Sequence, residues 1–107
     1  MKLIVQHKTA ISKLCKEHHV KNLYAFGSVI TQGFSSKSDI DLIVEFEPLD
    51  PLVYADNYFE LKFKLEDLLK RKVDLLEKQA IRNPVFKESI DQKKVLLYAR
   101  RDANLVN

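Results

Sequence analysis

Cysteine, glycine, proline and tryptophan are scarce in this chain, and long apolar runs are missing altogether. The single cysteine, Cys15, cannot form an internal disulfide, so the sequence does not describe a disulfide-rich secreted domain. No apolar run approaches the ~20 residues that span a bilayer, and the first apolar stretch is too short and too polar for a signal peptide. We therefore expect a soluble cytoplasmic protein that has no membrane partner.

The 2 glycines and 3 prolines are so few that each is expected to mark a specific turn or helix start. The apolar fraction of 46% and the charged fraction of 31% are those of an ordinary folded protein. A length of 107 residues supports one compact core and not two. These values predict a single domain over residues 1–107.

The basic residues give a net charge of +3 but are scattered along the chain. The short clusters Lys70-Arg71-Lys72, Lys93-Lys94 and Arg100-Arg101 are separated by acids. This pattern favours a solvated basic surface over a nucleic-acid groove, so nucleic acid is not an expected partner. A few cations can still attract a triphosphate.

Apolar periodicity predicts a mixed sheet flanked by helices, in the α/β (α+β) class. Asp50-Pro51 and Asn83-Pro84 are typical helix starts. Cys15 falls on the buried stripe of the first helix, and His18-His19 marks its end rather than a metal site. The predicted order is helix 3–18, strand 20–26, strand 39–46, helix 51–70, strand 73–76 and helix 84–91, with an apolar segment of undecided type at 95–98.

Gly27 and Ser28 follow the first predicted strand and lead into a short helix. Glycine lets the backbone approach phosphate oxygens closely, and the serine hydroxyl adds a donor at the positive end of that helix. Gly-Ser alone also marks ordinary turns. The segment is not a P-loop, because five residues separate Gly27 from Gly33 and Phe34 stands where lysine is required.

Asp39 and Asp41 open the second predicted strand. A period of two places them on one face together with Ile43 and Glu45. Two like charges beside an apolar sheet repel each other and lose hydration, and a divalent cation such as Mg²⁺ relieves both penalties. The alternative is an exposed face with merely solvated acids; Ile43 favours the partly buried face. Whether Glu45 reaches the same site stays open.

Asp74 is a lone acid between Val73 and Leu75 in the third predicted strand. If strand 73–76 lies beside strand 39–46, Asp74 completes a cluster of three carboxylates. Two-metal phosphoryl chemistry uses such a cluster, with ions roughly 3.5–4 Å apart. The alternative is a strand-end acid that caps a turn, and the combination of motifs favours the cluster.

The spacing of these motifs resembles a known family. Phe26-Gly27-Ser28, ten intervening residues, Asp39-Ile40-Asp41, a helix and then Val73-Asp74-Leu75 are similar to the nucleotidyltransferase domain of the DNA polymerase beta-like superfamily. Within it, the chain resembles the minimal nucleotidyltransferases that are paired with HEPN-domain proteins in toxin–antitoxin modules. The resemblance covers roughly residues 20–98.

The resemblance implies a function and a role for each site residue. Asp39, Asp41 and Asp74 would be the catalytic, metal-binding triad, with two Mg²⁺ ions, and Asp74 would also orient or deprotonate the acceptor. Gly27 and Ser28 would hold the triphosphate. The reaction would move AMP from ATP to a hydroxyl, and a tyrosine of a HEPN toxin as acceptor would make the chain an antitoxin.

A second hypothesis is a domain that has lost catalysis and regulates a partner by contact. Phe59 and Phe63 lie beside the inward stripe of the predicted helix 51–70 and could form an exposed strip for a partner or a second copy. The alternative is a broad helix face wholly inside the core.

Overall fold

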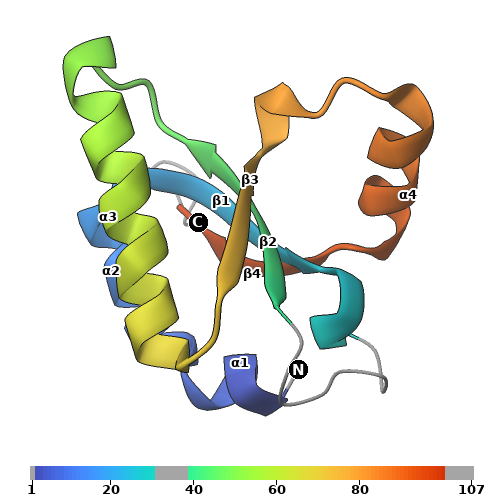
Figure 1. Cartoon of the computed structure of the whole chain (residues 1–107), viewed down its shortest axis with the longest axis horizontal. Helices are drawn as coiled ribbons and strands as arrows, with labels where there is room; N and C mark the ends of the chain where they lie inside the picture. The colour runs from blue at the N-terminus through green and yellow to red at the C-terminus, as the bar shows by residue number, and fades with distance from the viewer. Residues whose placement is uncertain (1, 31–38, 101–107) are drawn as a thin grey trace, which may run out of the picture.

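A four-stranded mixed sheet organises the structure, a computed structural model that describes residues 2–30 and 39–100 (Figure 1). The strand order is β3-β2-β1-β4, in which β1 pairs antiparallel with β2 and β4, and β2 pairs parallel with β3. The strands are β1 (Val20–Phe26), β2 (Ile40–Phe46), β3 (Val73–Glu77) and β4 (Val95–Ala99). The predicted mixed sheet flanked by helices is confirmed, and the undecided segment 95–98 belongs to edge strand β4.

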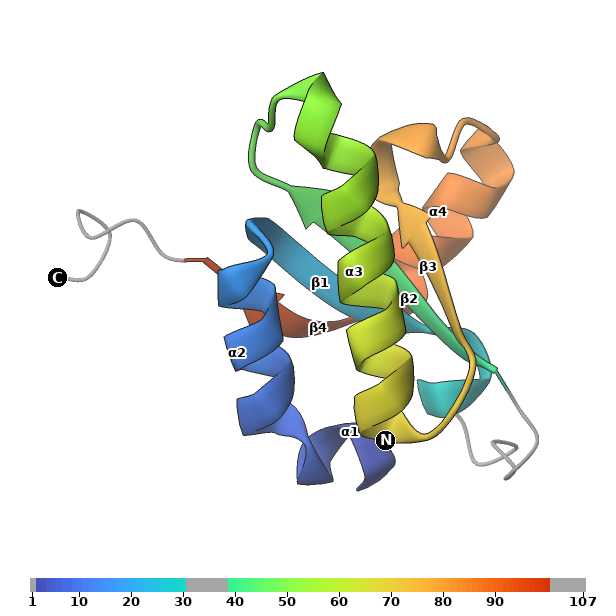
Figure 2. The same ribbon diagram turned by 60° about the vertical axis from the view of Figure 1, so that its left-hand side comes forward.

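Helices lie on both faces of the sheet (Figure 2). The helices α2 (Lys8–Glu17) and α3 (Pro51–Leu69) cover one face, and α4 (Pro84–Lys93) lies on the other. The main core fills the space under α2 and α3. Its β2 residues are Ile40, Leu42 and Val44, each fully buried, as the period of two predicts.

The long helix α3 makes the crossover that allows β2 and β3 to run parallel. The Asp50 side chain caps its start, because Asp50 Oδ1 accepts from the Leu52 N–H at 2.9 Å, and Pro51 occupies the first turn. Every fourth residue of the inward stripe is buried, at Leu61, Leu65 and Leu69. The predicted helix 51–70 is therefore confirmed to within one residue.

The N-terminal helical segment is broken, and the prediction of one helix over residues 3–18 is wrong in this respect. The structure has α1 (Lys2–Gln6) and α2, which are separated at His7. The His7 N–H donates to the Ile4 carbonyl, three residues back, at 3.1 Å, and the ring Nδ1 lies 2.9 Å from the Leu3 carbonyl oxygen. These local bonds replace one helical turn. Periodicity missed the break because the buried stripe, Ile4 and Ile11, continues across it.

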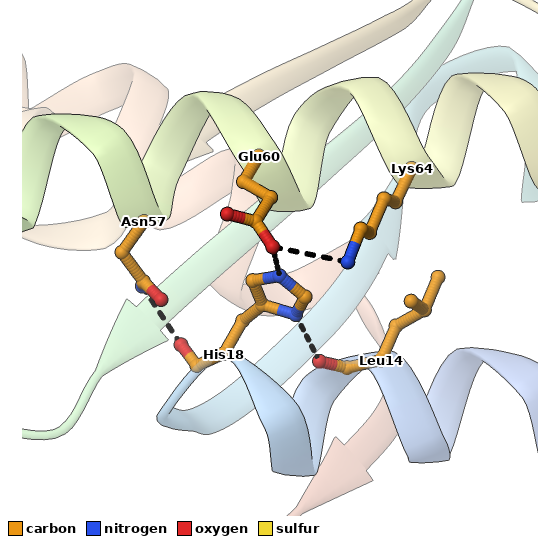
Figure 3. Close-up of polar contacts among 5 residues, drawn as sticks. All are labelled: Leu14, His18, Asn57, Glu60 and Lys64. Atoms are coloured by element: carbon orange, nitrogen blue, oxygen red, sulfur yellow. Dashed lines mark hydrogen bonds and ion pairs between the residues drawn. The ribbon is translucent and has the colours of Figure 1, made fainter.

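A polar network centred on His18 ties the end of α2 to α3 (Figure 3). The buried His18 ring donates from Nδ1 to the Leu14 carbonyl at 2.7 Å, and its Nε2 lies 3.2 Å from Glu60 Oε1. Glu60 also pairs with Lys64 at 3.0 Å, and Asn57 Nδ2 donates to the His18 carbonyl at 2.8 Å. His18 is thus a helix-end residue, as predicted.

The C-terminal helix α4 begins at a second capped proline. The Asn83 side chain accepts from the N–H groups of Val85 and Phe86, at 2.9 and 3.2 Å. The helix extends to Lys93, two residues beyond the predicted end. Within residues 2–30 and 39–100, no helix is long and apolar enough to cross a bilayer.

Candidate active site

Three residues form a row across the face of the sheet that lies opposite α2 and α3 and on which α4 packs. Phe26 on β1 is the register partner of Asp41 on β2, and Asp41 is the register partner of Asp74 on β3. Directly opposed residues of adjacent strands share a face and have Cβ atoms roughly 4.5–5.5 Å apart. The condition set for Asp74, that the third strand lies beside the second, is therefore met, and this pairing brings Asp41 and Asp74 together.

Asp41 lies in an environment that disfavours its charge. Burial raises the pKa of the Asp41 carboxyl, and the negative charges of Asp74 and Asp39 raise this pKa further. Asp41 is half-buried, whereas Asp39 and Asp74 are exposed. A bound cation would remove the electrostatic penalty that these acids impose on one another.

The three carboxylates do not form a closed cluster. Among the residues that the structure describes, no three His, Cys, Asp or Glu side chains converge as a metal site. The tight unit is the pair Asp41–Asp74, and Asp39 precedes β2 without belonging to it.

Gly27 lies against the carboxylate of Asp41. It has a φ of +78° and begins a short 3-10 helix, η1 (Gly27–Ile30). A Cβ at this position would lie 2.5 Å from Asp41 Oδ2. The sequence predicted glycine here for its approach to phosphate and missed this second reason. The side chain of Ser28 and the residues 31–38 lie outside the described part, so the role of Ser28 stays a prediction.

Glu45 takes part in a different set of contacts. Its carboxylate accepts from Asn22 Nδ2 at 2.9 Å and lies 3.7 Å from Lys78 Nζ. The Asn22 hydrogen bond, with help from the Lys78 charge, lowers the pKa of Glu45. Although alternation places Glu45 on the face of Asp41, these bonds direct it to β1 and to the segment after β3.

Comparison with known proteins defines the class. The family described as "Polymerase beta, Nucleotidyltransferase" matches residues 9–103, and the chain belongs to this family. Within it, the chain is one of the minimal nucleotidyltransferases. A Methanocaldococcus jannaschii relative named as a protein adenylyltransferase is 42% identical over 97 residues, which are 86% of this chain and 95% of that protein.

Solved structures agree with this assignment. A protein described as a minimal nucleotidyltransferase is 28% identical and has a TM-score of 0.73, covering 88% of this chain and 92% of its own. A toxin–antitoxin structure with AMP-PNP contains a chain that is 25% identical, with a TM-score of 0.66, covering 88% of this chain and 74% of that one.

Proposed function

We propose that this protein transfers AMP from ATP to a hydroxyl group and releases pyrophosphate. The observation that carries the proposal is the register pairing of Asp41 with Asp74 beside the left-handed Gly27 turn. Membership of the nucleotidyltransferase family and the similarity to a relative named as a protein adenylyltransferase support AMP as the transferred group.

Asp41 and Asp74 fit a site for Mg²⁺, with Asp39 as the third ligand. Their oxygen donors are those that Mg²⁺ prefers, and burial together with the charges of Asp74 and Asp39 raises the pKa of Asp41, a penalty that a bound cation would offset. Bound Mg²⁺ ions, two in this proposal, would supply positive charge to the triphosphate and to the attacking oxygen.

The chain's own residues position the reactants. The backbone N–H groups of the Gly27–Ser28 turn bind the triphosphate at the end of β1. Asp74 lies on the edge strand β3, where it is exposed and can accept the proton of an incoming hydroxyl. The acceptor oxygen then bonds to the α-phosphorus, the bond to the bridging oxygen breaks, and pyrophosphate leaves in line.

The acceptor that we propose is a tyrosine hydroxyl on a HEPN toxin. With this acceptor the chain acts as a modifying antitoxin, and we place it in the cytoplasm as a single domain. The similar chain in the toxin–antitoxin structure with AMP-PNP supports both the nucleotide and the type of partner. An acceptor on a separate protein also agrees with the exposure of Asp74 at the sheet edge.

The test is transfer of label from ATP to the co-encoded partner in the presence of Mg²⁺. ATP labelled at the α-phosphate should label the partner, whereas ATP labelled at the γ-phosphate should not. EDTA and the double variant Asp39→Asn, Asp41→Asn should each abolish labelling, and Asp56→Asn, at an exposed acid on α3, serves as the matched control. Full labelling by the double variant would refute the site.

A second candidate function is regulation of a partner by contact. Phe59 and Phe63 on α3 are 49% and 57% exposed and stack with ring centroids 6.1 Å apart, so the interpretation that places them inside the core is wrong. An exposed aromatic pair of this kind is typical of a protein interface. If contact alone inhibits the partner protein, the Asp41→Asn variant should still inhibit the activity of the partner, and the Phe59→Lys variant should not.

A further inference from the structure

A second aromatic pair lies beside the carboxylates, on the α4 face of the sheet. Phe26 is the register partner of Asp41, so its ring and the Asp41 carboxylate project from the same face. The ring of Phe86, from the first turn of α4, meets Phe26 edge to face, with centroids 5.9 Å apart. Phe86 remains 40% exposed, and Phe26 is half-buried.

The neighbouring aromatic on this face is already covered. Tyr24 lies two residues before Phe26 on β1, and Lys94 Nζ lies over its ring at 4.3 Å. Lys94 is held there by Asp91 at 2.9 Å. A ligand that needs an aromatic surface next to the carboxylates therefore meets Phe26 and Phe86 and not Tyr24.

The order of the strands separates the two reactants of the proposed reaction. β3 is an edge strand, so Asp74 faces the side from which an acceptor can approach. β1 lies on the other side of Asp41 and carries both Gly27 and Phe26. A nucleotide whose triphosphate binds at Gly27 therefore lies on the β1 side of Asp41, next to Phe26. The helix α4, which carries Phe86, lies behind the sheet in Figure 2, on the same face as Phe26.

We propose that Phe86, supported by Phe26, is the surface on which the base of the bound nucleoside triphosphate stacks. This inference rests on the proposed function, since it needs the nucleotide at Gly27 and Asp41. Stacking on an aromatic side chain is tolerant of base identity, because every base has a π face. The site should favour purines over pyrimidines through the larger stacked area, without reading the hydrogen-bonding edge of the base.

The test compares two ligands that differ in the base. Titrations of the metal-loaded protein with ATP and with inorganic tripolyphosphate are carried out on the native chain, on Phe86→Ala and on Phe59→Ala. Phe86→Ala should weaken ATP binding roughly 5- to 150-fold, the loss expected for one stacked base. Its affinity for tripolyphosphate should not change, and Phe59→Ala should bind both ligands as the native chain does.

A tryptophan gives a direct signal, because the chain has none of its own. In Phe86→Trp the single indole should retain the affinity for ATP, and its fluorescence should be quenched by ATP but not by tripolyphosphate. Equal weakening of both ligands by Phe86→Ala, or no weakening of either, would overturn the proposal. So would a Phe86→Trp fluorescence that does not respond to ATP.

Failure of the proposed function gives a different result. If the native chain binds neither ligand in the presence of Mg²⁺, the nucleotide site itself is refuted, and the base surface with it. If the native chain binds both ligands and transfers no label, the proposed transfer is refuted while the difference between the ligands still tests Phe86.

Discussion

The backbone of Gly27 and the carboxylate of Asp41 are in such close contact that no side chain fits between them. A Cβ at position 27 would lie 2.5 Å from Asp41 Oδ2, and the φ of +78° is itself one that favours glycine. Position 27 thus controls where a site carboxylate lies as well as how the chain turns after β1.

Replacing Gly27 by alanine should therefore impair catalysis more than folding. The new methyl group must displace the Asp41 carboxylate, and a displacement of about 1 Å at a reacting centre can cost roughly 100-fold in rate. The left-handed backbone adds a destabilisation of about 1–2 kcal/mol. Steady-state kinetics with ATP, beside urea unfolding of the same preparation, will separate the two effects.

Lys70→Gly is the matched control for backbone strain. Lys70 is also left-handed, with a φ of +56°, and is the C-cap of α3. Its exposed ion pair with Asp67 adds little stability. This variant should gain about 0.5–1 kcal/mol of stability and keep native activity. A Gly27→Ala enzyme with native kcat would show that Asp41 tolerates the displacement.

Asp41→Asn should raise the stability of the metal-free protein while it abolishes transfer. The pKa of Asp41 is raised by burial and by the neighbouring acids, so its ionised form at pH 7 opposes folding. An uncharged amide removes that repulsion. Thermal unfolding in EDTA should give a higher Tm for Asp41→Asn than for the native chain, and added Mg²⁺ should raise the Tm of the native chain only. The reverse order of Tm values in EDTA would contradict the electrostatic reasoning.

His18→Ala should destabilise the fold more than Glu60→Ala, although the two side chains touch. His18 is 3% exposed, and its loss leaves a void and removes the hydrogen bond from the ring to the Leu14 carbonyl, which together cost about 2–4 kcal/mol. The side chain of Glu60 is 56% exposed, so water screens its pairs with His18 and Lys64 and they contribute little stability. Urea unfolding measures both, and equal losses would show that the ion pair, not the burial, dominates.

Cys15 should make the stability of the protein sensitive to alkaline pH. Burial raises the pKa of this thiol to about 12, so the folded chain keeps the proton that the unfolded chain releases above about pH 8.5. The stabilisation is complete below that pH and is lost as the pH rises toward 12. Between pH 7 and 10.5 the Tm of the native chain should fall more steeply than that of Cys15→Ala. Parallel curves would contradict the burial of the thiol.

Local sequence patterns predicted the elements that present the site. The period of two in residues 39–46 placed the aspartates on one face and the core residues on the other, and Asp50-Pro51 placed the start of α3. Once β3 lies beside β2, the parallel register places Asp41 and Asp74 opposite each other. These features depend on alternation and capping, which act over a few residues.

Features that depend on tertiary contacts were not predictable in the same way. The apolar stripe of α1 and α2 continues across the break at His7, so the apolar periodicity does not reveal the break. The segment 95–98 becomes a strand only because it pairs with the free edge of β1. The contact of Gly27 with Asp41 joins the end of one strand to the start of the next across residues 31–38. The only sign of this contact in the local sequence was that the chain has so few glycines.

The parallel pairing of β2 with β3 also governs when the site comes into existence. Long-range parallel pairing forms late, because α3 must first close the crossover. A shift of β3 by one residue relative to β2 would turn Asp74 toward the core, so a chain with the shifted register has no Asp41–Asp74 pair. A nascent or misfolded chain can thus display Asp39 and Asp41 without the Asp41–Asp74 pair. The proposed transfer therefore requires the completed fold, because an immature chain lacks the paired carboxylates of Asp41 and Asp74.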